Sequence, residues 1–192
     1  MYRAVALLAL RSGADPADAA AMTALANARP ISVVHDAASP DGFHVFAGDE
    51  RLGSELYGND VSRVVSAVAA HQGLRDLLVE RQRAIAAQGP VIMAGRDIGT
   101  VVLPDAPLKI FLTASAEARV ERRLAELAER GTAVDRATLR AQIEERDRLD
   151  SDRIVAPLRP AADAIAIDSS NLTPDQVVDR IVALALAKPG SR

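Results

Sequence analysis

Apolar residues recur along the chain with two spacings, and these spacings predict a mixture of helices and strands. Apolar positions three or four residues apart predict helices over residues 2–11, 59–70, 73–87, 116–130, 136–149 and 174–187. Short continuous apolar runs predict buried strands of a parallel sheet at residues 91–93, 108–112 and 164–167. Because strands and helices alternate in the second half of the chain, we expect an α/β fold with helices flanking a parallel sheet.

Capping residues place several of the helix ends. Gly13 follows the first helix as a C-terminal stop. Asp15, which precedes a proline, predicts the start of a second helix that runs to about Asn27. Ser115 is placed to cap the long helix that follows it, and Thr173–Gln176 forms a capping box before the last helix.

An antiparallel hairpin is predicted in the first half of the chain. Ile31–His35 and Phe43–Ala47 are β-like segments, and a turn-rich linker at residues 36–42 connects them. We expect this hairpin to form a small lobe beside the main sheet. The polar segment that follows it, at residues 48–58, is expected to be irregular.

The most informative polar residues follow directly after the apolar run at residues 91–93. Arg96 and Asp97 lie side by side between Gly95 and Gly99. In an open α/β sheet, ligands bind beyond the carboxyl ends of the strands. An arginine there is suited to an anion and an aspartate to a hydrogen-bond donor. The alternative is that the pair only stabilises a turn.

Composition excludes several classes of protein. With 192 residues, of which 49% are apolar, the chain is expected to form one domain with a substantial core. The absence of cysteine excludes disulfides and thiol chemistry. No apolar run approaches the roughly 18 residues needed to span a bilayer, and no secretory signal is visible, so we expect a cytoplasmic protein that does not bind membranes. His35, His44 and His71 do not stand at metal-ligand spacing, and no metal site is predicted.

The charge pattern points to anion binding on the charged helices. The formal net charge is −3, and of the 23 basic residues only Lys109 and Lys188 are lysine. Arginines are concentrated between residues 119 and 159. The guanidinium fork suits bidentate binding of phosphate. The alternative is a set of solvated helices with ion pairs such as Arg140–Glu144.

Four blocks of the sequence together resemble bacterial cytidylate kinases. The blocks are Met1–Arg3, Ser66–Ala70 with Arg75, the Gly-Arg-Asp block Gly95–Leu112, and Glu145–Leu158. The resemblance extends in order over essentially the whole chain. It implies one P-loop nucleoside monophosphate kinase domain over residues 1–192, with a monophosphate-binding insert at 31–58 and a helical lid at 116–153. It also implies transfer of the γ-phosphoryl group of ATP to CMP or dCMP.

The resemblance also implies roles for individual residues. Three contact the cytosine edge, namely Ser66, Arg75 and Asp97. Three hold the acceptor phosphate, namely Arg3, Arg96 and Arg153, while Tyr2 lines the acceptor pocket. Arg146 and Asp150 reach the sugar and the lid, and the residues implied in catalysis are Arg96, Arg146 and Arg153. The lid arginines that face ATP are Arg119, Arg122 and Arg123. The implied partners are small molecules, with Mg²⁺ entering on ATP, no metal ligand in this chain, no nucleic acid, and a monomeric protein.

The sequence departs from the family pattern in its phosphate-binding loop. The loop Gly-x-x-x-x-Gly-Lys-Ser/Thr supplies the backbone cradle and the lysine for the donor phosphates, but the 192 residues contain no Gly-Lys pair. We therefore expect that the chain begins at an internal methionine, lacks the first strands and the P-loop, and is inactive as given. The loss of a central strand is expected to leave an open groove beside residues 91–93. Ala94 stands where an acidic residue is usual, and Tyr57 where an arginine is usual.

Two other functions remain open from the sequence. One is a non-enzymatic relative that binds a nucleoside monophosphate or a protein partner without ATP, which the departures at Ala94 and Tyr57 favour. The other is an RNA-binding module that uses the arginine-rich helices. The isoelectric point of about 5.6 and the scarcity of aromatic residues argue against the RNA-binding module.

Overall fold

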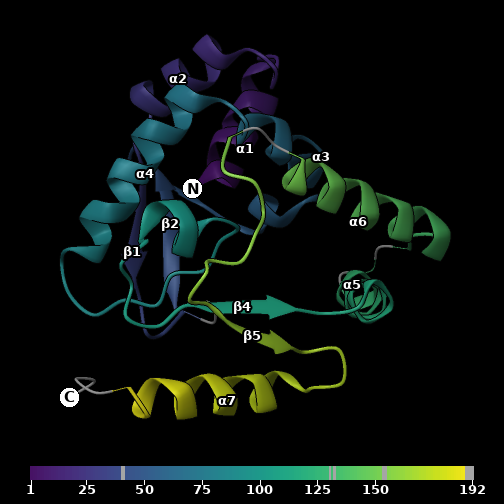
Figure 1. Ribbon diagram of the computed structural model, residues 1–192. Helices are drawn as coiled ribbons and strands as arrows, with labels where there is room; N and C mark the ends of the chain where they lie inside the picture. Colours follow the sequence, from purple (N-terminus) through teal and green to yellow (C-terminus); the bar gives the residue numbers. More distant parts are fainter. Residues whose placement is uncertain (40–41, 130, 132, 153–154, 189–192) are drawn as a thin grey trace. The chain divides into compact units, whose positions relative to one another are not determined.

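The computed structural model describes residues 1–39, 42–129, 131, 133–152 and 155–188. Figure 1 shows the order of the elements along the chain. The chain divides into two compact units, Met1–Val91 and Ile92–Arg192. The first contains a three-stranded antiparallel sheet and the second a two-stranded parallel sheet. The predicted α/β class, with helices and a small parallel sheet, is confirmed.

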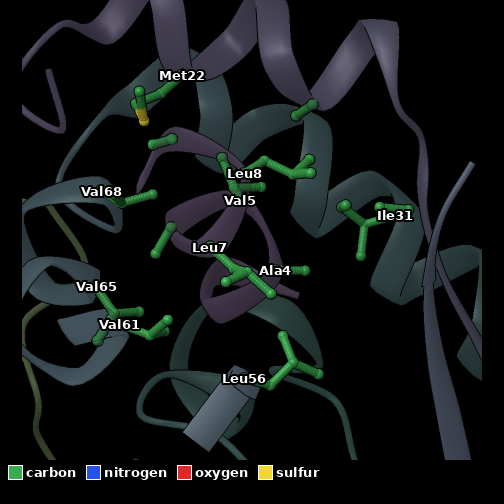
Figure 2. Packing of buried hydrophobic residues seen from close by; sticks show 14 of the residues in the cluster. Ala4, Val5, Leu7, Leu8, Met22, Ile31, Leu56, Val61, Val65 and Val68 are labelled. Atoms are coloured by element: carbon green, nitrogen blue, oxygen red, sulfur yellow. The ribbon is translucent and has the colours of Figure 1, made fainter. Parts of the chain in front are cut away.

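Helix α1 is the centre of the first unit. The helices of this unit are α1 (Tyr2–Ser12), α2 (Ala19–Ala28), α3 (Asn59–Val68) and α4 (Gln72–Ala86). Every residue of α1 from Ala4 to Ala9 is buried, as expected for a helix that is apolar on all sides. Figure 2 shows the side chains packed around α1, among them Met22, Ile31, Leu56, Val61, Val65 and Val68. Each large apolar side chain buried here contributes about 1.5–3 kcal/mol.

The two ends of the loop between α1 and α2 follow different capping rules. Gly13 ends α1 in the left-handed conformation, with φ 69°, which a residue without a Cβ adopts at no steric cost. Helix α2 begins at Ala19 rather than at the predicted Asp15, because Asp18 is the residue that caps it. The Asp18 carboxylate accepts from the backbone N–H groups of Ala20 and Ala21.

The predicted hairpin is confirmed residue for residue. Strands β1 (Ile31–His35) and β2 (Phe43–Ala47) are antiparallel and paired over their full lengths. The segment expected to be irregular contains two further elements, β3 (Glu50–Leu52) and the 3₁₀-helix η1 (Ser54–Tyr57). Strand β3 forms because Gly48, with φ 59°, allows a two-residue turn that pairs Ala47 with Glu50.

The second unit contains the parallel sheet and three helices among its described residues. Its elements are β4 (Ile110–Thr113), α5 (Ala116–Glu129), α6 (Arg136–Ser151), β5 (Ile165–Asp168) and α7 (Pro174–Leu186). Strands β4 and β5 are parallel, with Ile110 opposite Ile165, and they lie within two residues of the predicted strands. Helices α5 and α6 pack through Val120, Leu127 and Leu139. Arg130, the predicted end of α5, lies outside the described residues.

The predicted caps of this unit are confirmed. The Ser115 hydroxyl accepts from the backbone N–H of Ala118 at 3.2 Å. Thr173 and Gln176 form a complete capping box with a proline at the first helical position of α7. Asp135 caps α6 by accepting from the N–H of Thr138. No helix in the described part of the chain combines the length and apolar composition of a membrane span.

The prediction of a buried strand at residues 91–93 is wrong. These residues have no regular secondary structure, and Val91 and Ile92 are 44% and 95% exposed. A parallel strand is stable when its backbone pairs with a neighbour and both faces are covered. No strand of the described structure pairs with this segment, so the apolar run alone does not make it a strand.

A small pocket lies within the second unit, next to the Gly-Arg-Asp loop. It has a volume of about 120 Å³, and its lining includes Met93, Gly95, Ile98, Lys109 and Phe111. On the same unit, the Lys109 Nζ donates to both carboxylate oxygens of Asp163, at 2.9 and 2.8 Å. Because residues 91–93 form no strand, the groove expected beside such a strand has no counterpart to test, and the pocket lies beside an irregular segment.

Acid is expected to destabilise the protein through its surface carboxylates. Hydrogen bonds from Thr138 lower the pKa of Asp135, and those from Ser170 lower the pKa of Asp168. The Lys109 ammonium likewise lowers the pKa of Asp163. A carboxyl with a lowered folded-state pKa contributes stability above its unfolded pKa and loses it as the pH falls through the folded value.

We therefore expect the contribution of these carboxylates to the free energy of unfolding to change little between pH 7 and pH 5 and to fall below about pH 4, where unfolded Asp and Glu titrate. Urea unfolding curves recorded at pH 7, 5, 4 and 3 measure this dependence. The Asp163→Asn variant removes one of the titrating groups and should show a shallower decline. A stability that rises on acidification contradicts the expectation.

Candidate active site

The first unit holds Arg3 at the junction of η1 and α3. The Arg3 Nε donates to the carbonyl oxygen of Leu56 at 2.7 Å, and its Nη2 donates to Ser62 Oγ at 2.7 Å. The guanidinium carbon lies 5.7 Å from the centroid of the Tyr57 ring. Arg3 is thus held at its donor edge by hydrogen bonds and at its face by an aromatic ring.

A second arginine of the same unit is also held by a tyrosine. Arg75, on α4, is only 2% exposed. Its Nη1 donates to the carbonyl oxygen of Ala69 at 3.2 Å, and its guanidinium carbon lies 5.4 Å from the centroid of the Tyr2 ring. Ser66 of α3 is also buried. A buried arginine is suited to binding an anionic or strongly polar ligand.

The Gly-Arg-Asp loop of the second unit is compact. A Cβ atom on Gly95 would lie 2.8 Å from the Ile98 side chain, so a larger residue there would require the Ile98 side chain to move. The carbonyl oxygen of Asp97 accepts from the backbone N–H groups of Thr100 and Val101, at 3.3 and 2.9 Å, and starts the short π-helix η2 (Ile98–Val102). Asp97 itself is 6% exposed.

Arginines and aspartates of the second unit form a cluster, which we call the Arg–Asp cluster. Its members are Arg96, Arg119, Arg146, Asp147 and Asp150. Arg96 Nη2 lies 3.3 Å from Asp150 Oδ2, and Arg96 Nη1 lies 4.0 Å from Asp147 Oδ1. Asp147 also forms an ion pair with Arg119 of α5. The cluster therefore joins the Gly-Arg-Asp loop to both α5 and α6.

The arginine charge in this cluster is incompletely compensated. Burial lowers the pKa of Arg146, the Arg96 charge lowers it further, and the carboxylates of Asp150 and Asp147 oppose these effects. The Nε atoms of Arg119 and Arg146 are buried and have no hydrogen-bond partner among the described residues. Three guanidinium groups around two carboxylates leave a net positive charge, which favours an anionic ligand.

The other two predicted lid arginines have different surroundings. Arg122 donates through Nη1 to Ser169 Oγ at 3.1 Å and through Nη2 to the Ser169 carbonyl oxygen. It thus connects α5 to the loop after β5. Arg123 forms an ion pair with Glu126 at 2.8 Å and adds its charge to the field at Arg146.

The predicted site residues fall into two groups, one in each unit. Tyr2 and Arg75 are in contact in the first unit, and Arg3 lies beside Tyr57. The second unit brings together Arg96, Arg119, Arg146 and Asp150. Arg153 lies outside the described residues. The roles that the resemblance implies for these residues remain predictions.

Sequence reasoning assigned no role to Asp147 and did not foresee the contact of Tyr57 with Arg3. Asp147 and Asp150 are three residues apart on α6, so they share one helix face. Their spacing in the sequence could therefore have indicated that the two carboxylates lie close together.

The residues described do not fit a magnesium site of their own. No group of three or more His, Asp or Glu residues in the described part of the chain is arranged to hold a metal ion. The hydroxyl and lysine of a Gly-Lys-Ser/Thr loop are absent from the sequence as well. We therefore assign no metal ligand among the described residues.

Comparison of the sequence with known proteins shows the family to which this chain belongs. A sequence profile described as cytidylate kinase matches residues 1–187. The chain belongs to the cytidylate kinase family. The resemblance inferred from the Gly-Arg-Asp block and its companions is thereby confirmed at the level of the family, which is a family of ATP-dependent kinases.

Individual relatives are similar over most of this chain. The cytidylate kinase of Pelotomaculum thermopropionicum is 49% identical over 183 residues, which cover 95% of this chain and 80% of that protein. The cytidylate kinase of Mycobacterium avium is 47% identical over 182 residues, covering 94% of this chain and 78% of that protein. A bifunctional pantoate ligase/cytidylate kinase of Synechococcus sp. is 45% identical over 184 residues, covering 96% of this chain and 34% of that protein.

Proposed function

We propose that this chain binds CMP or dCMP as phosphoryl acceptor and carries the arginines that act in transfer from ATP. In this proposal Ser66, Arg75 and Asp97 contact the cytosine, and Arg3 and Arg96 hold the acceptor phosphate. The observation that carries the proposal is the Arg–Asp cluster, in which three partly buried arginines, two of them with a buried Nε atom, face two carboxylates.

The arginines of the first unit support the acceptor role. Arg75 is buried and held by Tyr2 and the Ala69 carbonyl, so its position is set before a ligand arrives. Arg3 is held in the same way by Leu56, Ser62 and Tyr57. Groups that are positioned in advance contribute more to binding, because less conformational freedom is lost when the ligand binds.

The arginines of the second unit support the transfer role. Phosphoryl transfer requires little covalent chemistry of the protein and depends on positioning and on positive charge around the transferred group. Arg96, Arg119 and Arg146 supply this charge from a loop and two helices. Asp147 and Asp150 hold these guanidinium groups together despite their mutual repulsion, so the charge stays concentrated at one place.

The second part of the proposal concerns ATP, the phosphoryl donor. ATP with Mg²⁺ is the phosphoryl donor that the family implies, and these 192 residues contain no Gly-Lys pair to cradle its phosphates. We propose that the 192-residue chain binds the acceptor but does not by itself transfer the phosphoryl group. In this proposal, the lid arginines promote phosphoryl transfer only when a phosphate-binding loop is also present.

Binding of CMP to the 192-residue chain tests the acceptor role. The chain has two tyrosines and no tryptophan, and both tyrosines lie beside arginines of the proposed site. NMR spectra of the tyrosine rings should therefore shift on titration with CMP or dCMP, and calorimetry should show one saturable site. AMP at equal concentration is the control and should produce no saturable change. Absence of CMP binding overturns the acceptor role.

A coupled assay for CDP formation with ATP, Mg²⁺ and CMP tests the donor side separately. We expect CMP binding without CDP formation. Sustained CDP formation by the 192-residue chain would show that the donor phosphates are held by residues other than a Gly-Lys loop. In that case the acceptor role stands and the proposal of inactivity is wrong.

A further inference from the structure

Tyr57 occupies a special position in the first unit, at the end of η1. The residue before it, Leu56, is buried in the core, and the residue after it, Gly58, is the N-cap of α3. Tyr57 is itself partly buried against the same core. The backbone that carries the Tyr57 ring is therefore held in place. The centroid of this ring lies 5.7 Å from the guanidinium carbon of Arg3.

The same short segment holds Arg3 from three directions. Leu56 provides a carbonyl oxygen to Nε and Ser62 a hydroxyl oxygen to Nη2, both at 2.7 Å. The Ser62 hydroxyl donates its own proton to the carbonyl oxygen of Gly58 at 2.9 Å, which leaves its lone pair directed to Arg3. The donors of a guanidinium all lie in its plane. The ring of Tyr57 restrains the face of that plane and occupies none of these donors.

We propose that Tyr57 is a positioning residue that sets the plane of the Arg3 guanidinium for a phosphomonoester ligand. The inference rests on the proposed function, because Arg3 is the residue proposed to hold the acceptor phosphate. Tyr57 acts through Arg3 and makes no contact with the ligand. An aromatic ring on the face, rather than the phenolic hydroxyl, is what the role requires.

Substitutions that separate the ring from the hydroxyl test the role. Tyr57→Leu removes the ring and keeps an apolar side chain against the core, and we expect it to weaken CMP binding about fivefold, as for loss of a partly exposed cation–π contact. Tyr57→Phe and Tyr57→Trp keep a ring and should restore the affinity to within about twofold. Calorimetric titrations measure the affinities of the parent chain and of the three variants for CMP and for cytidine.

Two readouts distinguish positioning from a general loss of structure. Because Tyr57 acts on the phosphate through Arg3, Tyr57→Leu should leave the affinity for cytidine unchanged. In an Arg3→Gln background the same substitution should have no further effect on CMP affinity, since residues that act as a unit are not additive. An equal weakening of CMP and cytidine, or full additivity with Arg3→Gln, overturns the proposal.

The contact itself can be examined without any ligand. A ring on the face of Arg3 shifts the NMR signals of the Arg3 δ-methylene protons, and this shift should be lost in Tyr57→Leu and kept in Tyr57→Phe. If the parent chain binds no CMP but the shift behaves as described, the acceptor role fails while the contact stands. If the shift is the same in Tyr57→Leu and the parent, Tyr57 does not hold Arg3 and the inference is wrong.

Discussion

The Asp150→Ala variant is expected to lose about 3 kcal/mol of folding stability, the cost of breaking a buried ion pair by removal of one partner. Asp150 is 3% exposed, and its carboxylate lies 3.3 Å from Arg96 and 3.9 Å from Arg146. Without it, two partly buried guanidinium groups remain close to each other, with Asp147 as the remaining carboxylate of the cluster. Their repulsion adds to the cost of their desolvation.

Urea unfolding at pH 7 measures this loss, and Asp152→Ala is the matched control. Asp152 is an exposed aspartate two residues further along the chain, paired with Arg148 at 3.5 Å. Removal of such an exposed pair should change the stability by less than about 0.5 kcal/mol. Equal losses in the two variants would show that the Asp150 carboxylate does not stabilise the cluster.

The Arg75→Met variant is expected to weaken CMP binding by about 50-fold, the effect of removing a charged hydrogen-bonding group from a buried site. Among the described residues of the first unit, Arg75 is the one charged side chain that is buried. Methionine keeps much of the apolar stem that packs beside Tyr2, so the change removes mainly the guanidinium. The prediction depends on the proposed contact between Arg75 and the cytosine.

Calorimetric titration with CMP checks this prediction, and Arg81→Met provides the control. Arg81 lies on the same helix and donates to the carbonyl oxygen of Ala26 at 3.2 Å, in a region for which no ligand contact is proposed. Both variants lose one arginine and its hydrogen bond to a backbone carbonyl oxygen. A similar loss of CMP affinity in both variants would assign the effect to net charge or folding rather than to the site.

Local sequence rules were sufficient for most of the helices and for the hairpin. The apolar spacing located α3 and α4, and the capping box at Thr173 located the start of α7. These elements depend on residues a few positions apart, whose physical effect is visible in the sequence. The same is true of β3, which the Gly48-Asp49 turn signal could have revealed.

The failure at residues 91–93 has a different cause. The run Val91-Ile92-Met93 has the composition of a buried strand, but a strand exists only with a partner, and pairing is a non-local property. Ile92 is 95% exposed, so the hydrophobic pattern there does not report burial in this structure. The start of α2 was misplaced for a related reason. Asp15 and Asp18 are both suitable N-cap residues, and residue type alone does not distinguish them.

The site was predicted as a set of residue types and not as a set of contacts. The Gly-Arg-Asp block and the arginines of α5 and α6 were named from the resemblance, and the structure brings Arg96, Arg119 and Arg146 together. The sharing of Asp147 between Arg96 and Arg119 was not predicted. It depends on how α5 and α6 pack, which the helical periodicity of each helix alone does not determine.

The Lys109–Asp163 ion pair has a practical consequence for work with this protein. Lys109 is 9% exposed and its ammonium is held by both oxygens of Asp163, so it reacts poorly with amine-directed reagents. The only other lysine is Lys188, which is exposed just after α7. Of the two lysine side chains, Lys188 is therefore the one expected to carry amine-directed dyes and surface linkers.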